Sequence, residues 1–311
     1  MQFHLITLLA SLSLAYAELH RCGTADPDDK TRTNLDKAYA NYKSGQVTRR
    51  DGGIVIDTYV NIVTTQAKSE LYTPKQVEDQ MNAMNEAYAP MGVSFNTISV
   101  NFTINEQWAA AGISSPEELA MKSALHQGSY ADLNLYFLSD MPSGLLGFCY
   151  FPVADPTGAD RINDGCMNLA DTLPGGSAEN YDMGMTAVHE TGHWSQPKSI
   201  HNLKAANTDF PFPPSPPLPH LSLISPLGLY HVFQGTRTCS PSSPGDSVSD
   251  TPLQRSPTTG CPTQSDTCPD QPGVDSIHNY MDYSYDECVY EFSEGQMERA
   301  VAVWEQYRSG E

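Results

Sequence analysis

Residues 183–194 read MGMTAVHETGHW, and the interpretation of the whole chain starts from this stretch. Its apolar beginning predicts a helix. His189 and His193, four residues apart, then lie on one helix face, where both imidazoles can reach one zinc ion. Glu190 points towards water at the metal, whose pKa zinc lowers towards about 7, and can take its proton. The same pentapeptide also fits two surface histidines on a helix, so a third ligand has to come from elsewhere.

Residues 227–231, LGLYH, supply that ligand in His231. Some zinc sites of this kind take a glutamate from a later helix, but no suitable helix with a glutamate follows soon after His193. If Trp194 were joined directly to Leu227, the chain would read HETGHWLGLYH, which is the extended pattern H-E-x-x-H-x-x-G-x-x-H. The glycine of that pattern lets the chain turn sharply out of the helix, so that the last histidine meets the metal.

A second motif, NYMDY at residues 279–283, follows in the order that this pattern requires. It is similar to the methionine turn that forms the floor of such a metal site, with Met281 as its methionine. Taken alone, Met281 would be interpreted as ordinary core packing. The extended zinc motif followed by the methionine turn is the more specific signal.

On these residues the chain resembles the pappalysin family of metzincins, especially the secreted metalloproteases of fungi and the archaeal ulilysin. The matching stretches are HRCGT (20–24), GLLGFCYFP (144–152), INDGCMNL (162–169), AVHETGHW (187–194), LGLYHVFQGT (227–236), GDSVSDTP (245–252) and NYMDYS (279–284). The resemblance implies a zinc endopeptidase with three histidine ligands, Glu190 as general base and Met281 in the turn. It also implies that Tyr283 stabilises the developing oxyanion or swings onto the metal, with simple packing as the alternative.

Seven cysteines and two aspartates are interpreted through the same resemblance. It implies the disulfides Cys239–Cys268 and Cys261–Cys288, which leave Cys149 and Cys166 as a third pair by elimination. Cys22 then remains, and in the relatives a prosegment cysteine at this place occupies the fourth zinc position and silences the enzyme. A stray thiol or an intermolecular disulfide is the alternative. Asp246 and Asp250 lie where relatives bind calcium, although an acidic solvated turn explains them equally well.

Residues 195–226 depart from the family, because they interrupt the zinc motif. They contain eight prolines, no glycine, no glutamate and one aspartate, Asp209. His201 and His220 lie inside the segment without metzincin spacing. We interpret it as a retained intron translated in frame, with a proline-rich loop over the cleft as the alternative.

The order of strand and helix patterns predicts the fold class. Strands are expected at residues 54–63, 93–104 and 133–138, a helix from Thr73-Pro74 to Tyr88, and another from a capping box at residues 115–118 to about Gln127. This order indicates an α/β (α+β) domain, a twisted mixed sheet with helices above. Residues 144–151 predict a last edge strand, able to pair with an extended peptide or purely structural. A cysteine-rich irregular part and a closing helix at 294–307 complete the domain.

The N-terminus predicts export. An apolar run at residues 5–14 and the small residues Ala15 and Ala17 are typical of a signal peptide over residues 1–17, with a buried helix as the alternative. Residues 18–50 are polar, lack apolar periodicity and end in Arg49-Arg50, which indicates a prosegment before a catalytic domain over residues 51–311. Asn101-Phe102-Thr103 is the only N-x-[ST] sequon and predicts a glycan on Asn101, unless it stays unmodified.

The charge excludes several partners. With 37 acidic and 17 basic residues, the formal net charge is −20, which argues against nucleic acid and anionic membranes. We expect an extracellular monomer that acts on protein or peptide substrates. One alternative is a secreted zinc-binding protein without catalysis, impaired by residues 195–226. Another alternative is a zinc hydrolase that acts on something other than peptides. The predicted edge strand argues against it, because such a strand is suited to binding an extended peptide backbone.

Overall fold

The computed structural model describes residues 21–47, 52–150, 156–194 and 227–307. Five strands form one sheet in the order β2-β1-β3-β5-β4. Their bounds are Ile54–Thr64 (β1), Val93–Ile104 (β2), Leu133–Leu138 (β3), Gly147–Cys149 (β4) and Cys166–Leu169 (β5). Neighbouring strands are parallel except β4, which runs antiparallel to β5. The predicted mixed sheet is therefore confirmed, and the edge strand β4 is its antiparallel member.

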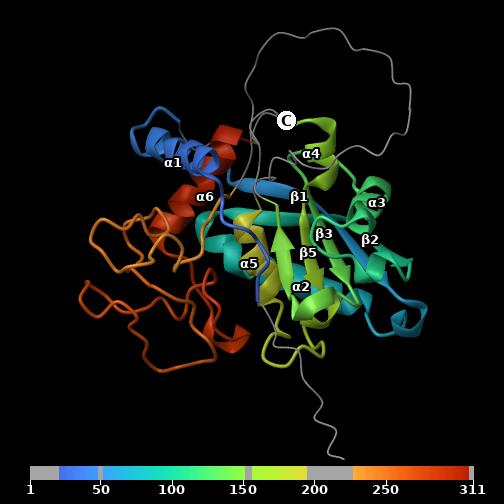
Figure 1. Cartoon of the computed structure of the whole chain (residues 1–311). Coiled ribbons are helices and arrows are strands. Elements are labelled where there is room, and N and C mark those ends of the chain that lie inside the picture. The colour runs from blue at the N-terminus through green and yellow to red at the C-terminus, as the bar shows by residue number, and fades with distance from the viewer. Residues whose placement is uncertain (1–20, 48–51, 151–155, 195–226, 308–311) are drawn as a thin grey trace, which may run out of the picture.

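Six α-helices surround the sheet in the described ranges (Figure 1). They are Asp29–Lys43 (α1), Pro74–Tyr88 (α2), Pro116–Leu125 (α3), Gly158–Asn163 (α4), Met185–His193 (α5) and Glu294–Tyr307 (α6). Short 3-10 helices cover Gln66–Lys68, Ala89–Met91, Trp108–Ala110, Pro142–Gly144, Ala170–Thr172 and Asp286–Cys288. One apolar core joins the sheet to α2, α5 and α6, and a smaller core lies under α3. No helix of the described residues is long and apolar enough to cross a membrane.

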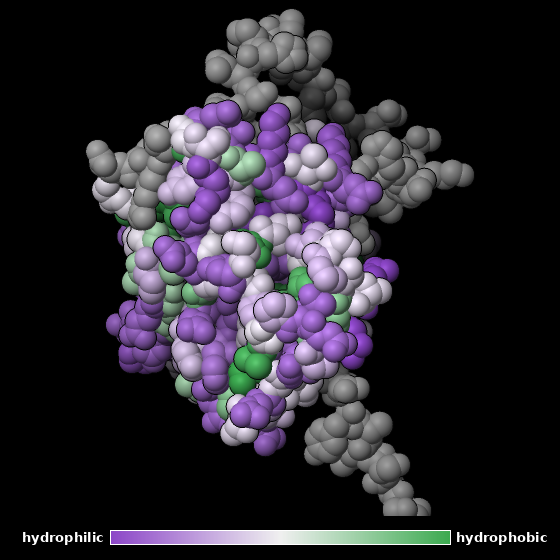
Figure 2. Space-filling model, turned by 90° about the vertical axis from the view of Figure 1, so that its left-hand side faces the viewer, coloured by the Kyte–Doolittle hydropathy of each residue, from purple (hydrophilic) through white to green (hydrophobic). Residues whose placement is uncertain are grey.

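Residues 227–293 form the irregular part drawn in orange and red-orange in Figure 1, and the red helix α6 closes the domain at the residues expected. Figure 2 shows this side of the molecule, where hydrophilic residues dominate the surface and hydrophobic ones are scattered. Such a surface is consistent with a solvated, acidic protein.

Helix α1 lies within residues 18–50, where the sequence shows no apolar periodicity and no helix was expected. The Asp28 side chain accepts a hydrogen bond from Thr31 N and starts the helix. Leu35 and Ala38 are buried against Tyr230 and Val303 of the body. Two small apolar contacts make too weak a pattern for sequence analysis, so the helix depends on its packing beside α6 (Figure 1).

Two predicted boundaries also need correction. Ser115 caps α3, but the Glu118 carboxylate accepts from Ser114 N instead of closing a capping box on residue 115, and the helix ends at Leu125. The edge strand pairs only over residues 147–149 instead of 144–151, because residues 142–144 form a 3-10 turn. Residues 1–17, Arg49-Arg50, Phe151 and the segment 195–226 lie outside the described residues, and so do the predictions made for them.

Candidate metal centre

Helix α5 carries the first half of the zinc motif through the middle of the core. Its residues from Thr186 to His193 are all buried. Tyr88 of α2 donates a hydrogen bond to Val188 O at 2.8 Å and so fixes the helix against α2. A Cβ at Gly192 would lie 2.6 Å from Met281 Sδ, so only glycine lets the methionine turn approach the helix this closely. The sequence motif contains this glycine, but its packing reason appears only in the structure.

Three histidine side chains converge at the end of α5. His193 Nε2 lies 3.1 Å from His189 Nε2 and 2.9 Å from His231 Nε2. In the two histidines of α5, the other ring nitrogen faces a backbone carbonyl oxygen. His189 Nδ1 lies 2.7 Å from Tyr280 O, and His193 Nδ1 lies 2.9 Å from Leu229 O. A carbonyl accepts, so each Nδ1 carries the proton and each Nε2 presents a lone pair.

Facing lone pairs at this separation repel one another unless a cation lies between them, and neutral imidazole nitrogens are the ligands that zinc prefers. Burial lowers the pKa of His193 to about 4 and, with the neighbouring histidines, lowers the pKa of His189 and His231 well below the usual range, so all three stay neutral. The donor set and its burial therefore fit a zinc ion.

His231 reaches the centre although 32 residues separate the two halves of the motif. Leu229 N donates to Gly192 O at 2.9 Å, and Gly228 adopts a left-handed φ of 56°. Arg299 of α6 donates to Gly228 O at 3.1 Å, which holds the turn from the other side. Trp194 and Leu227, on either side of the undescribed segment, are both fully buried. Contacts of residues 227–231 with α5 and α6 hold the third histidine.

The methionine turn lies below the histidines. Met281 is fully buried, its N donates to Asn279 Oδ1, and Met281 O accepts from Val232 N, next to the third histidine. Tyr283 places its hydroxyl 3.3 Å from His231 Nε2, and the hydroxyl donates to Cys22 O at 3.4 Å. Burial raises the pKa of Tyr283, so the hydroxyl keeps its proton. The structure thus brings Tyr283 to the centre, within reach of a bound group.

Glu190 is the acidic side chain of the centre. It is fully buried, and burial raises its pKa to about 8 against the opposing effect of donors from Cys22 and Thr24. Thr24 Oγ1 donates to Glu190 Oε2 at 3.0 Å. A Cβ at Gly147 would lie 2.7 Å from Glu190 Cγ, so β4 can run this close only with glycine there. A buried carboxylate beside three imidazoles and the edge strand β4 can exchange protons with a reacting group.

The segment before α1 lies across the centre. The sulfur of Cys22 and the three histidine nitrogens all lie within 4.8 Å of one another, the only group of three or more metal-binding side chains in the described residues. The Cys22 thiol donates to Glu190 Oε2 at 3.3 Å. Gly23 N donates to Gly147 O at 2.8 Å, and Thr24 Oγ1 accepts from Cys149 N at 3.0 Å. Residues 22–24 therefore occupy the free edge of β4.

Arg21 anchors this segment in a closed pocket. Its side chain is buried, forms an ion pair of 3.0 Å with the buried carboxylate of Asp286, and donates to Ser284 O at 2.8 Å. The guanidinium also lies over the Tyr181 ring. Asp286 is held in turn by Met183 N and Met185 N, just before α5. Sequence analysis missed this pocket, although the HRCGT stretch contained the arginine.

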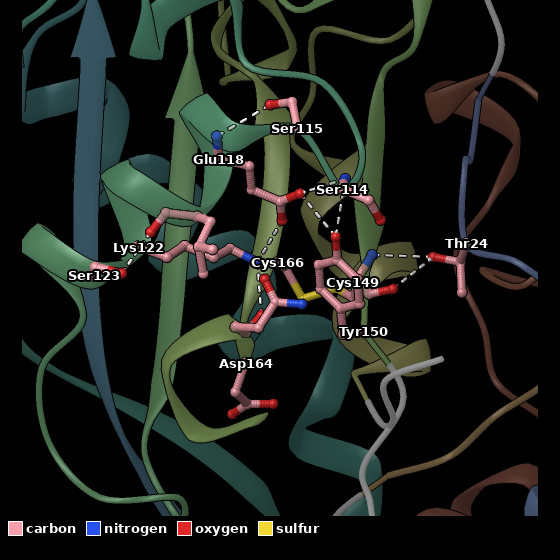
Figure 3. Close-up of polar contacts among 12 residues, drawn as sticks. Thr24, Ser114, Ser115, Glu118, Lys122, Ser123, Cys149, Tyr150, Asp164 and Cys166 are labelled. Atoms are coloured by element: carbon pink, nitrogen blue, oxygen red, sulfur yellow. Dashed lines mark hydrogen bonds and ion pairs between the residues drawn. A yellow bond between two sulfur atoms is a disulfide. The ribbon is translucent and has the colours of Figure 1, made fainter. Parts of the chain in front are cut away.

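A second polar cluster supports the end of β4. Tyr150 donates to Glu118 Oε2 at 2.7 Å, and Lys122 pairs with Glu118 Oε1 at 2.9 Å, both carboxylate and ammonium being buried. Figure 3 shows this cluster next to the Cys149–Cys166 disulfide. Thr24, which is bonded to the backbone of Cys149, is drawn in the same view. Lys122 Nζ also lies 4.3 Å from the centre of the Tyr150 ring. The cluster ties the residue after β4 to α3 and so positions the strand edge.

The cysteine pairs, the two aspartates and Asn101 complete the set of predicted residues. The structure contains the disulfides Cys149–Cys166, Cys239–Cys268 and Cys261–Cys288, and it leaves Cys22 free. Asp246 is buried and accepts from Thr251 and Val248, and burial raises its pKa to about 7. Asp250 accepts from Ser293 and Gly295 N at the start of α6. Asp246 Oδ1 and both carboxylate oxygens of Asp250 therefore accept hydrogen bonds from the protein itself. Asn101 is half-buried on β2.

Comparisons with known proteins agree with this geometry. No family model matches the chain. It is 39% identical over 304 residues to an extracellular metalloprotease of Pyricularia oryzae, covering 96% of this chain and 93% of that protein. It is 44% identical over 259 residues to one of Colletotrichum graminicola, covering 82% and 78%.

Solved structures with a similar fold share only about a fifth of their residues with this chain. A promirolysin mutant of Tannerella forsythia superposes with a TM-score of 0.63 at 20% identity, covering 90% of this chain and 92% of that one. Mature mirolysin in complex with a cleaved peptide gives 0.58 at 21% identity, covering 83% and 97%.

Proposed function

The chain belongs to the extracellular metalloproteases, pappalysin-type metzincins and metalloendopeptidases, and from that membership we propose how its own residues cleave peptide bonds. His189, His193 and His231 hold one zinc ion, and Glu190 is the general base. The observation that carries the proposal is the convergence of three Nε2 atoms, with the Nδ1 atoms of His189 and His193 bonded to backbone carbonyls. The enzyme acts on protein substrates as a monomer, without nucleic acid or membrane. Calcium near Asp246 and Asp250 stays a prediction.

Each residue then has a role in hydrolysis. Zinc, when bound, supplies the Lewis acidity that makes water a nucleophile and polarises the peptide carbonyl. Glu190 accepts the proton of the attacking water and returns it to the leaving amine, a step for which a carboxyl with a raised pKa is suited. Tyr283 donates to the developing oxyanion. Gly147 O and Cys149 N, which bind residues 23 and 24 here, pair with an extended substrate.

The ligand set is tested by metal content. Replacing His231 by alanine removes one of three ligands and is expected to weaken zinc binding by more than the ~10–100-fold that loss of an outer-shell partner costs. Zinc content is measured after dialysis against a chelator series, together with chelator-sensitive hydrolysis of casein. His278→Ala is the matched control, since the His278 ring bonds to Cys288 O and stacks on Tyr290 and is not part of the three-histidine group. Equal zinc retention in both variants would contradict the proposal.

The Arg21 pocket suggests which substrates fit. A buried carboxylate that already holds a guanidinium is suited to a basic side chain next to the cleaved bond, once the segment has left. Asp286→Asn keeps the shape but loses the charge. It is expected to lower kcat/KM for peptides with arginine or lysine on the order of 10–100-fold, from about 1.5–3 kcal/mol for a charged hydrogen bond.

The readout is the ratio of kcat/KM between basic and apolar peptides on the same enzyme, which general damage to the fold does not change. An unchanged ratio in Asp286→Asn would remove this pocket from specificity and leave the catalytic proposal untouched.

Residues 195–226 are proposed to be absent from the working protein. The contacts of Leu229 with Gly192 and of His231 with His193 support a direct junction of Trp194 with Leu227. Deleting the segment is expected to give a more active enzyme with greater resistance to proteolysis, measured as kcat/KM and as half-life against trypsin. Tryptic peptides from inside the segment in the natural secreted protein would exclude the retained intron.

A further inference from the structure

Strand β2 forms an edge of the sheet without the usual protection. It pairs with β1, and in the described part of the chain no strand pairs with its outer side. Its twelve residues, VSFNTISVNFTI, contain no charged residue and no proline, although the whole chain carries 37 acidic and 17 basic residues. Four large apolar side chains on it are 38–53% exposed: Ile98, Val100, Phe102 and Ile104.

The two halves of β2 differ in how their outer backbone is satisfied. In the first half, the Asn85 side chain from α2 bonds both to Phe95 N, at 2.7 Å, and to Phe95 O, at 3.2 Å. In the second half, Asn105 N donates inward to Thr64 O. Because backbone direction alternates along a strand, the groups of Ile104, Phe102 and Val100 point outward. The exposed apolar side chains therefore belong to the same residues as the open backbone groups.

Such an edge is a template for another strand. Natural proteins protect edges with charges, proline, short strands or covering elements, and a long, uncharged, apolar edge leads to aggregation. The irregularity in the β1–β2 register lies between Thr58 and Tyr59, before the unprotected half. In that half, none of these protecting features is present among the described residues.

The sequon lies in the unprotected half. Asn101, Phe102 and Thr103 are consecutive residues of β2. The Asn101 side chain is half-buried and points to the face opposite Phe102, because side chains alternate along a strand. Asn101 Nδ2 donates to Asn61 Oδ1 at 3.3 Å. A glycosylated amide keeps one N–H, so this bond can hold the side chain while it carries a sugar.

We propose that an N-linked glycan on Asn101 is the device that keeps β2 from pairing edge to edge with a second copy of this chain. A strand added to β2 would lie ~4.8 Å away, and its side chains would approach that of Asn101 to about 5 Å. The branched core of a glycan fills that space and prevents the approach. This inference concerns solubility and is independent of the catalytic proposal, so either can fail alone.

The test compares two substitutions at one position. Thr103→Ala removes the sequon and keeps Asn101, and Thr103→Ser keeps the sequon as the matched control. At equal concentration, wild type and Thr103→Ser are expected to stay monomeric in light scattering, and Thr103→Ala to show at least a doubling of mass. In the associated species, amide hydrogen exchange of residues 98–104 should slow about tenfold or more, as expected for newly paired strands.

Two further arms separate shielding from folding. Trimming the glycan of the folded, secreted protein to its first sugar should cause the same association. Phe102→Lys in the Thr103→Ala background should restore the monomer, because a charge on the edge replaces the glycan. An unmodified Asn101 in the secreted protein, monomers after sequon loss and trimming, or association without slower exchange in β2 would each overturn the proposal.

Discussion

Replacing Glu190 by alanine is expected to lower kcat/KM for peptide hydrolysis on the order of 10²–10⁴-fold, the usual contribution of a general base. The attacking water then has no proton acceptor, because Glu190 is the carboxylate that contacts Cys22 beside the three histidines. Zinc content should stay at the wild-type value, since the three imidazoles and the carbonyls that hold His189 and His193 are untouched.

The measurement pairs initial rates on a quenched peptide with zinc analysis of the same samples. Glu179→Ala serves as control, since Glu179 is an exposed glutamate outside the centre. Near-normal turnover in Glu190→Ala would show that another group accepts the proton, and loss of zinc would show that Glu190 supports the metal instead.

Replacing Cys22 by alanine is expected to make the zymogen partly active. A thiolate at the fourth position of zinc excludes the water that the reaction needs, and the Cys22 sulfur lies with the three histidine nitrogens. Losing a contact worth about 1.4 kcal/mol or more raises the active fraction about tenfold or more. Full activity is not expected, because Arg21 still pairs with Asp286 and α1 still packs on the body.

The double variant Arg21→Ala, Cys22→Ala should release more activity than either single change, and removal of residues 18 to about 50 should release all of it. The control is Thr33→Ala, an exposed residue of α1 that bonds only its own helix in the contacts described. Activity is measured before and after prosegment removal. A Cys22→Ala zymogen as silent as the parent would mean that the prosegment blocks the cleft by bulk, or that its zinc ligand lies elsewhere.

Much of this molecule could be predicted from short-range sequence patterns. Strand and helix periodicity predicted the order of β1, α2, β2, α3 and β3, and α6 begins and ends at the predicted residues. These elements repeat an apolar spacing that matches their own backbone geometry, so the information is local. The zinc motif is local as well, because two histidines four apart share a helix face whatever surrounds the helix.

Other features depend on which segments meet. The site of Arg21 requires Asp286, which lies 265 residues later in the sequence. Helix α1 is stabilised because Leu35 and Ala38 pack against Tyr230 and Val303. Glycine at 147 and 192 is needed because Glu190 and Met281 approach them, which no spacing indicates.

The alternation of β2 shows the same limit most clearly. Its period predicted a strand, and the strand is there, but only the packing of α2 decides that Val93 and Phe95 are buried while Phe102 and Ile104 stay exposed. The sequence by itself therefore determined the elements and the chemistry of the metal-binding side chains. The tertiary structure decided which segments cover each element and which side chains close the metal centre. The reason is that burial and close packing depend on two surfaces that meet, whereas a single stretch of sequence describes only one of those surfaces.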